Sequence, residues 1–317
     1  MLISSEFFAG ASDEQAAKIV RDLDAARVHI AITLRPLAKI LASRWQQNVQ
    51  EGARIKYEEW LHAVLDTPES DHGKRFWSRQ RHDVLIRRWV NVAGADRVTV
   101  VIPDESDHDA LLKSFEGLLG LTNGTLVSQR DASNRSMTLE EVEAIRNFNE
   151  QFFAEHFSKA LYYKVMSRGA AHLLKSRTPA DNEARLVTPS WARDKANTLG
   201  VEVASSIKAL GLSVVGDVQG LVDRDVNTET GATTINVVEK ISPALAAQVS
   251  IGVLLASGGA RGERGAGLGR VGPTWGEPQE LFRISTLELV GVIMRRVWAG
   301  GAESIAGLFR RNGPPRR

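Results

Sequence analysis

The sequence of 317 residues contains no cysteine. This absence excludes disulfides, thiolate metal sites and thiol nucleophiles, and it means only that the compartment places no redox demand on the chain. An excess of one charge is also missing, because 40 basic and 38 acidic residues leave a formal net charge of +2. We therefore do not expect a general nucleic-acid-binding surface.

Long hydrophobic runs are missing as well. No uninterrupted apolar stretch approaches the roughly 20 residues that a membrane span requires, and no basic and apolar leader follows Met1. We therefore expect a cytoplasmic protein without a membrane span. Hydrophobic residues make up 43% of the chain, which is enough for a sizeable core in one large domain or two ordinary ones.

Strand and helix patterns alternate along the first part of the chain. The segment 28–34 is β-branched and too apolar to have one face in water, which favours a parallel sheet covered on both sides. Together these patterns predict an α/β fold with a parallel sheet flanked by helices. The expected strands are 2–5, 28–34, 97–102 and 212–215, and the expected helices are 12–23, 36–45, 57–65, 82–92, 106–119, 138–153, 160–174 and 191–210.

The organisation of the chain changes twice. Residues 1–125 are expected to form the α/β core, and residues 126–220 a helical continuation of the same domain. Residues 221–317 are expected to be a variable, Gly- and Arg-rich loop and a basic tail, with an amphipathic helix at 286–298. The repeats in "GGARGERGAGLGR" favour a linker over a nucleic-acid-binding segment, because Glu263 interrupts them.

The junction after the second expected strand carries the candidate binding residues. Ligands of parallel α/β sheets gather at the carboxyl ends of the strands, near the positive N-termini of the helices that follow. Arg35 and Pro36 stand at such a position, and Ser43 comes eight residues after the arginine, on the side of the helix that residues 36, 39 and 40 share. The guanidinium and the hydroxyl can therefore contact one anion. A helix start with a surface arginine is the structural alternative.

The stretch "VHIAITLRPLAKILASRW" resembles the 3'-phosphate-binding segment of the sulfotransferases that use 3'-phosphoadenosine 5'-phosphosulfate (PAPS). That segment has an apolar strand, an arginine with a proline close behind, and a serine eight positions after the arginine. The resemblance implies that Arg35 and Ser43 bind the 3'-phosphate of PAPS. It extends through "LISSEFFAG", "FWSRQRHDVLIRRWVNVAGADRVTVVIPDE" and "NRSMTLEEVEAIRNFN" to about residue 220, and it implies a P-loop NTPase-like sulfotransferase fold.

One part of the family pattern is missing. The phosphosulfate-binding loop, a strand followed by a lysine and small hydroxylated residues, would precede the strand expected at 2–5. The sequence "GLGRVG" at 267–272 does not replace it, because it follows no strand and leads into Pro273. We therefore expect this sequence to be an N-terminally shortened sulfotransferase.

Other residues complete the expected site. Ser5 lies where the family places small polar residues beside the substrate or cofactor, and Glu6 is the best-placed general base for a hydroxyl acceptor. Arg135, before a capped helix, is a further candidate for phosphate binding, although a helix-entry turn explains it equally well. His29 and His82 fit structural roles, and no histidine spacing indicates a metal site.

The sequence leaves two functions open. The first is sulfuryl transfer from PAPS to a hydroxyl of a carbohydrate, lipid or small metabolite. The second is a non-catalytic remnant or adaptor that binds 3',5'-ADP weakly or serves as an interaction protein. Neither the acceptor nor the oligomeric state follows from the sequence.

Overall fold

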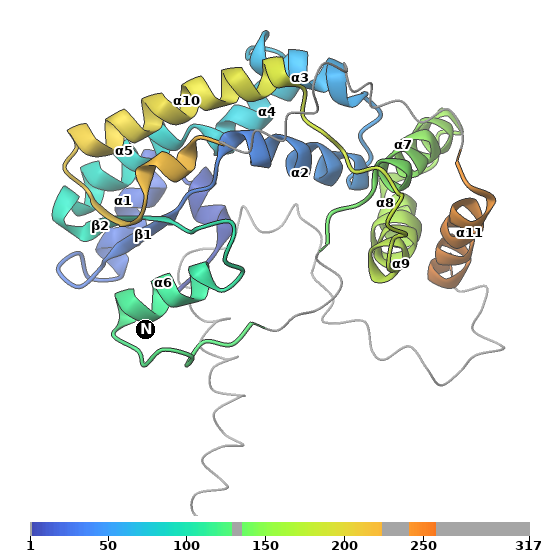
Figure 1. Ribbon diagram of the computed structural model, residues 1–317. Helices are drawn as coiled ribbons and strands as arrows, with labels where there is room; N and C mark the ends of the chain where they lie inside the picture. The colour runs from blue at the N-terminus through green and yellow to red at the C-terminus, as the bar shows by residue number, and fades with distance from the viewer. Residues whose placement is uncertain (1, 129–134, 224–240, 258–317) are drawn as a thin grey trace, which may run out of the picture. The chain divides into compact units, whose positions relative to one another are not determined.

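The computed structural model describes residues 2–128, 135–223 and 241–257 (Figure 1). The chain is a mixed α/β protein that is mostly helical, and its described residues form one small sheet. Three parallel strands lie in the order β1-β2-β3, so that the middle strand pairs with both others. The strands are β1 (Ile30–Thr33), β2 (Val98–Ile102) and β3 (Ser213–Gly216). This agrees with the predicted strands at 28–34, 97–102 and 212–215.

Helices make up most of the remaining described chain. The α-helices are α1 (Asp13–Asp22), α2 (Leu37–Gln50), α3 (Tyr57–Leu65), α4 (Asp71–Gln80), α5 (His82–Ala93), α6 (Ala110–Leu119), α7 (Leu139–Ala154), α8 (Lys159–Tyr162), α9 (Ala171–Ser176), α10 (Ser190–Ala209) and α11 (Pro243–Ser257). Shorter segments are the 3₁₀ helices η1 (Glu6–Gly10), η2 (Ala95–Arg97) and η5 (Val218–Leu221), and the π-helical η4 (Tyr163–Ala170).

Capping boxes begin two of these helices, as their sequences predict. At the start of α1 the backbone N–H of Gln15 donates to Ser12 Oγ over 3.2 Å, and the N–H of Ser12 donates to Gln15 Oε1 over 2.8 Å. Thr138 and Glu141 make the same reciprocal pair at the start of α7. Each box satisfies two backbone donors that the first turn of a helix leaves without partners.

The strand expected at residues 2–5 is wrong. This segment is irregular and leads into η1, where Ser5 Oγ accepts the N–H of Phe7 over 3.2 Å. Leu2 is 55% exposed and Ile3 is only partly buried, so the apolar side chains that suggested a buried strand are not in a core. Within the described residues, the edge of β1 that faces away from β2 pairs with no strand.

The central strand β2 is buried on both faces, and helices cover one face of the sheet. α1, α5 and part of α10 pack there against Ile32 of β1 and against Val98 and Val100 of β2. The opposite face of β1 is open, because Ala31 and Thr33 are exposed. The expectation that helices bury both faces is therefore wrong for this edge strand. An apolar strand at an edge needs only one buried face.

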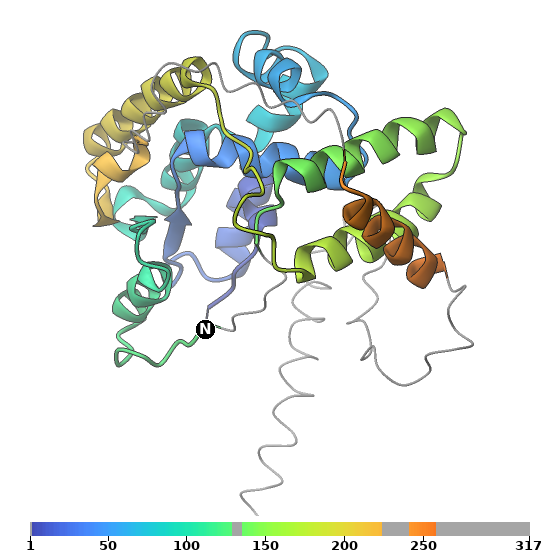
Figure 2. The same ribbon diagram turned by 45° about the vertical axis from the view of Figure 1, so that its right-hand side comes forward.

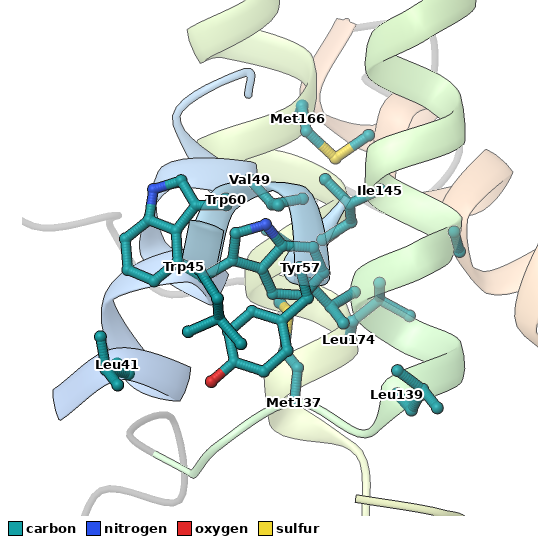
Figure 3. Packing of buried hydrophobic residues seen from close by; sticks show 14 of the residues in the cluster. Leu41, Trp45, Val49, Tyr57, Trp60, Met137, Leu139, Ile145, Met166 and Leu174 are labelled. Atoms are coloured by element: carbon teal, nitrogen blue, oxygen red, sulfur yellow. The ribbon is translucent and has the colours of Figure 1, made fainter. Parts of the chain in front are cut away.

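A second hydrophobic core joins the helices that do not cover the sheet. Trp45 of α2 contacts Tyr57 of α3 with ring centroids 5.1 Å apart, and Tyr57 stacks on Trp60 at 6.2 Å (Figure 3). Ile145 of α7 and Leu174 of α9 belong to the same cluster. Helices before and after residue 125 thus share one hydrophobic core.

Helix α11 lies within the segment 221–317, which was expected to be a variable loop and tail. It packs against η4 and α9, as Figures 1 and 2 show. Glycines permit this close approach: a Cβ on Gly252 would lie 2.5 Å from the Cα of Ala170, and a Cβ on Gly169 would lie 2.6 Å from the Cβ of Ala256. The glycine-rich stretch 258–272 and the helix expected at 286–298 lie outside the described residues.

Candidate functional site

The carboxyl ends of the three strands meet at one edge of the sheet, because all three strands are parallel. Thr33, Ile102 and Gly216 end the strands, and Arg35 and Glu105 follow within three residues of β1 and β2. Pro36 is the N-cap residue of α2, which begins at Leu37, two residues after the arginine. The predicted position of Arg35, at the carboxyl end of a parallel strand and before a helix, is confirmed.

Arg35 forms a two-point ion pair with Glu105. Its Nε donates to Glu105 Oε1 over 2.6 Å, and its Nη2 donates to Oε2 over 2.8 Å. The pair is partly solvated, since the side chains are 50% and 24% exposed. Each partner favours the charged form of the other: the hydrogen bond raises the pKa of Arg35 and lowers the pKa of Glu105. A planar fork of this kind matches the oxygens of a carboxylate or a phosphate.

Two further residues of α2 extend this edge along the helix. Lys39 and Ser43 follow Arg35 at intervals of four residues and therefore lie on the same side of the helix. The Lys39 ammonium contributes to the lowered pKa of Glu105, and it lies 4.0 Å from Asp223 Oδ1. The hydroxyl of exposed Ser43 donates to the backbone oxygen of Ile40 over 3.0 Å, which leaves its lone pairs available to a donor.

The structure places Glu6 at the start of η1 and Ser5 at its N-cap, and both are exposed. η1 contacts α4, and the negative charge of Glu6 acts on Arg44 of α2. Burial lowers the pKa of Arg44, and the nearby guanidinium of Arg79 lowers it further. Glu6 is thus close enough to act on Arg44, the residue after Ser43. The Ser5 hydroxyl is used as the N-cap of η1. Their roles in acceptor and cofactor binding stay predictions.

Arg135 is positioned by the helical part of the chain. Its Nη1 and Nη2 donate to the two oxygens of buried Glu141 over 2.8 and 2.6 Å. Its Nε donates to the backbone oxygen of Arg177 over 3.0 Å, and its remaining bonds reach backbone oxygens of Ser136 and Leu174. None of these bonds reaches the sheet. Binding a phosphate here would require Arg135 to give up a buried carboxylate.

Sequence reasoning did not select Glu105, Lys39 or Asp223 for the site. Glu105 had a detectable signal, because it ends "VVIPDE" three residues after β2 and thus at the same sheet edge as Arg35. Asp223 had no such signal in the sequence. Its position depends on α10, where the side-chain oxygen of Asn197 accepts the backbone N–H of Asp223 over 2.9 Å. Long-range hydrogen bonds of this kind leave no pattern in a sequence.

No family model, curated protein or solved structure matches this chain. In the part of the chain that the structure describes, no cluster of three potential metal ligands occurs. None of the described helices combines the length and the apolar character that crossing a bilayer requires.

Proposed function

We propose that the carboxyl edge of the sheet binds the 3'-phosphate of an adenosine nucleotide, and that the protein is a PAPS-dependent sulfotransferase of P-loop NTPase-like fold. The observation that supports this proposal is the position of Arg35. Its half-exposed guanidinium fork lies directly beyond a parallel strand, with Lys39 one helical turn further on and Ser43 another turn beyond. This is where the sequence resemblance implies phosphate binding.

The residues present fit a phosphate monoester. The carboxylate of Glu105 presents two oxygens to Arg35, and a phosphate can present two oxygens in the same arrangement. A partly solvated ion pair contributes only about 0–1 kcal/mol. The same two guanidinium donors would meet the phosphate oxygens, and a phosphate dianion carries more charge than a carboxylate. Arg35 can therefore exchange Glu105 for the phosphate at a small energetic cost.

In this proposal each residue has a separate task. Arg35 and Ser43 hold the nucleotide at its 3'-phosphate, Ser5 contacts the cofactor, and Glu6 takes the proton of the acceptor hydroxyl. Bound PAPS supplies an activated sulfuryl group for a carbohydrate, lipid or small-metabolite acceptor. Positioning and positive charge govern reactions of this type, so the arginine contributes by fixing the nucleotide and not by acid–base chemistry.

A second function, nucleotide binding without transfer, is favoured by the ion pair itself. Glu105 occupies the fork of Arg35 at 2.6 and 2.8 Å, so the carboxylate competes with any phosphate for the same donors. Such a protein would bind 3',5'-ADP weakly and would not turn over PAPS. Incubation with radiolabelled PAPS and a panel of hydroxyl acceptors separates the two functions, because only an enzyme transfers the label.

Calorimetric titration with 3',5'-ADP tests the binding site, with 5'-AMP as the ligand that lacks the 3'-phosphate. We expect Arg35→Ala to weaken binding of 3',5'-ADP about 10-fold or more, which corresponds to one lost charge-assisted interaction. Glu105→Gln should strengthen binding about 2- to 5-fold, because it removes a competitor that contributes at most about 1 kcal/mol. Binding of 5'-AMP should respond little to either substitution.

A matched control is available in Arg81. This arginine makes a similar two-point pair with Asp83 at 2.9 and 2.9 Å and is 55% exposed. If Arg81→Ala weakens binding as much as Arg35→Ala, general charge explains the effect and the proposed site is wrong. The same conclusion follows if the wild-type protein does not distinguish 3',5'-ADP from 5'-AMP.

A further inference from the structure

A cavity of about 800 Å³ lies among α3, α4, α5 and α10, away from the residues that the proposed function uses except for Arg35, which borders it. Its size is within the range of roughly 300–1,000 Å³ that is typical of small-molecule sites. The lining combines aliphatic side chains such as Leu65 and Leu199 with the indole of Trp77. Trp77 already donates its N–H to the backbone oxygen of Val64 over 2.8 Å, so it offers the cavity an apolar ring surface.

One polar side chain in this lining is almost fully buried and makes no hydrogen bond to the residues that the structure describes. His82, the first residue of α5, is 9% exposed, and within the described residues no hydrogen bond involves its ring. Burial lowers its pKa to about 4, so the imidazole is neutral at physiological pH. A neutral imidazole provides one N–H donor and one nitrogen acceptor. Neither ring nitrogen of His82 is among the fully enclosed, unsatisfied atoms of the described residues, so the ring keeps access to the cavity and can form a hydrogen bond to a ligand.

The charges around the cavity are balanced. Arg35 pairs with Glu105, Arg81 with Asp83, and Lys195 with Asp66. The two lining cations without an ion pair among the described residues, Lys74 and Arg87, are matched in number by the lining acids Glu69 and Glu202. A ligand with a net charge therefore gains little here, whereas an uncharged ligand avoids the cost of desolvating an ion.

From these observations we infer that the cavity binds an uncharged aromatic alcohol, whose ring lies against Trp77 and Leu199 and whose hydroxyl hydrogen bonds to His82. Aromatic rings add edge-to-face or offset stacking to the area they bury. The hydroxyl either donates to the bare imidazole nitrogen or accepts from the N–H. This inference rests on His82 and its neighbours and does not depend on the proposed nucleotide site.

The experiment uses 2-naphthol as the fluorescent probe and naphthalene as the analogue without a hydroxyl. We expect saturable binding of 2-naphthol to the wild-type protein, and weaker binding of naphthalene. His82→Phe keeps an aromatic ring in the wall but removes the hydrogen bond, so it should weaken 2-naphthol binding about 3- to 10-fold and leave naphthalene binding unchanged. His108→Phe, at an exposed histidine outside the cavity lining, is the matched control and should change neither affinity.

A second variant locates the binding. Thr198 is exposed on α10 and lines the cavity, so Thr198→Trp should fill the space without altering the core and should abolish binding of both compounds. Far-ultraviolet circular dichroism confirms that each variant is folded. Three results overturn the inference: no saturable binding of 2-naphthol to the wild type, equal 2-naphthol affinity in His82→Phe, or binding that persists in Thr198→Trp.

Discussion

Acidification should destabilise this protein through His82 before its carboxylates titrate. The ordinary pKa of the imidazole is 6.5, and burial lowers it to about 4 in the folded state. The unfolded chain therefore binds a proton between these two values, whereas the folded chain does not. The contribution of the neutral ring to stability is complete above pH 6.5 and is lost as the pH falls toward 4.

The size of this loss follows from the two pKa values. Between about pH 7 and about pH 5 the free energy of unfolding should fall by about 2 kcal/mol on account of this one group. Carboxylates contribute little in that window. The hydrogen bond from Arg177, for example, lowers the pKa of Glu183 to about 2. Glu183 therefore affects stability only below its ordinary pKa of 4.5.

Urea denaturation at the two pH values measures the effect, with His82→Phe as the test and His108→Phe as the control. A phenylalanine cannot bind a proton, so the His82→Phe protein should retain most of the stability that the wild type loses on acidification. The control should lose as much stability as the wild type, because His108 is exposed. An equal loss in His82→Phe and wild type would refute the assignment of a buried, neutral imidazole at the start of α5.

Two pairs of substitutions test the packing. Gly216 ends β3 with φ +98, and a Cβ there would lie 2.0 Å from a backbone oxygen of β2. Gly216→Ala should therefore lower the free energy of unfolding by about 3 kcal/mol or more. Gly120 has φ +64 but open space around it, so Gly120→Ala should lower the free energy of unfolding by only about 1 kcal/mol. Thermal unfolding of the two variants shows whether Gly216→Ala is the more destabilising. Trp45 donates its buried N–H to a backbone oxygen over 3.1 Å, but the N–H of Trp60 has no partner among the described residues. In urea denaturation Trp45→Phe should cost about 1 kcal/mol more than Trp60→Phe, because it removes a hydrogen bond to the part-buried Ile55 carbonyl that Trp60 has no counterpart for among the described residues.

Local patterns in the sequence determined several elements of this protein. The capping boxes at Ser12 and Thr138 begin helices because each needs only residues three positions apart. The three β-branched, apolar segments form strands, and the parallel arrangement follows from the helices between them. The position of Arg35 at the carboxyl end of β1 was predictable for the same reason, since the strand and the helix after it are both encoded nearby.

Only the tertiary structure decided which long-range partners these residues meet. Apolar letters at residues 2–5 suggested a strand, but a strand forms only where a segment pairs with a neighbour, and this segment caps a 3₁₀ helix instead of pairing with the outer edge of β1. Arg35 meets Glu105 across 70 residues of sequence, and Arg135 gives its donors to Glu141 and to backbone oxygens of a helix end. The burial of His82 at the start of α5 likewise depends on tertiary packing, because α10 packs against α5 and residues of α3 and α4 line the same cavity as His82. Propensity and capping act over a few residues, whereas burial and charge pairing depend on how distant segments pack.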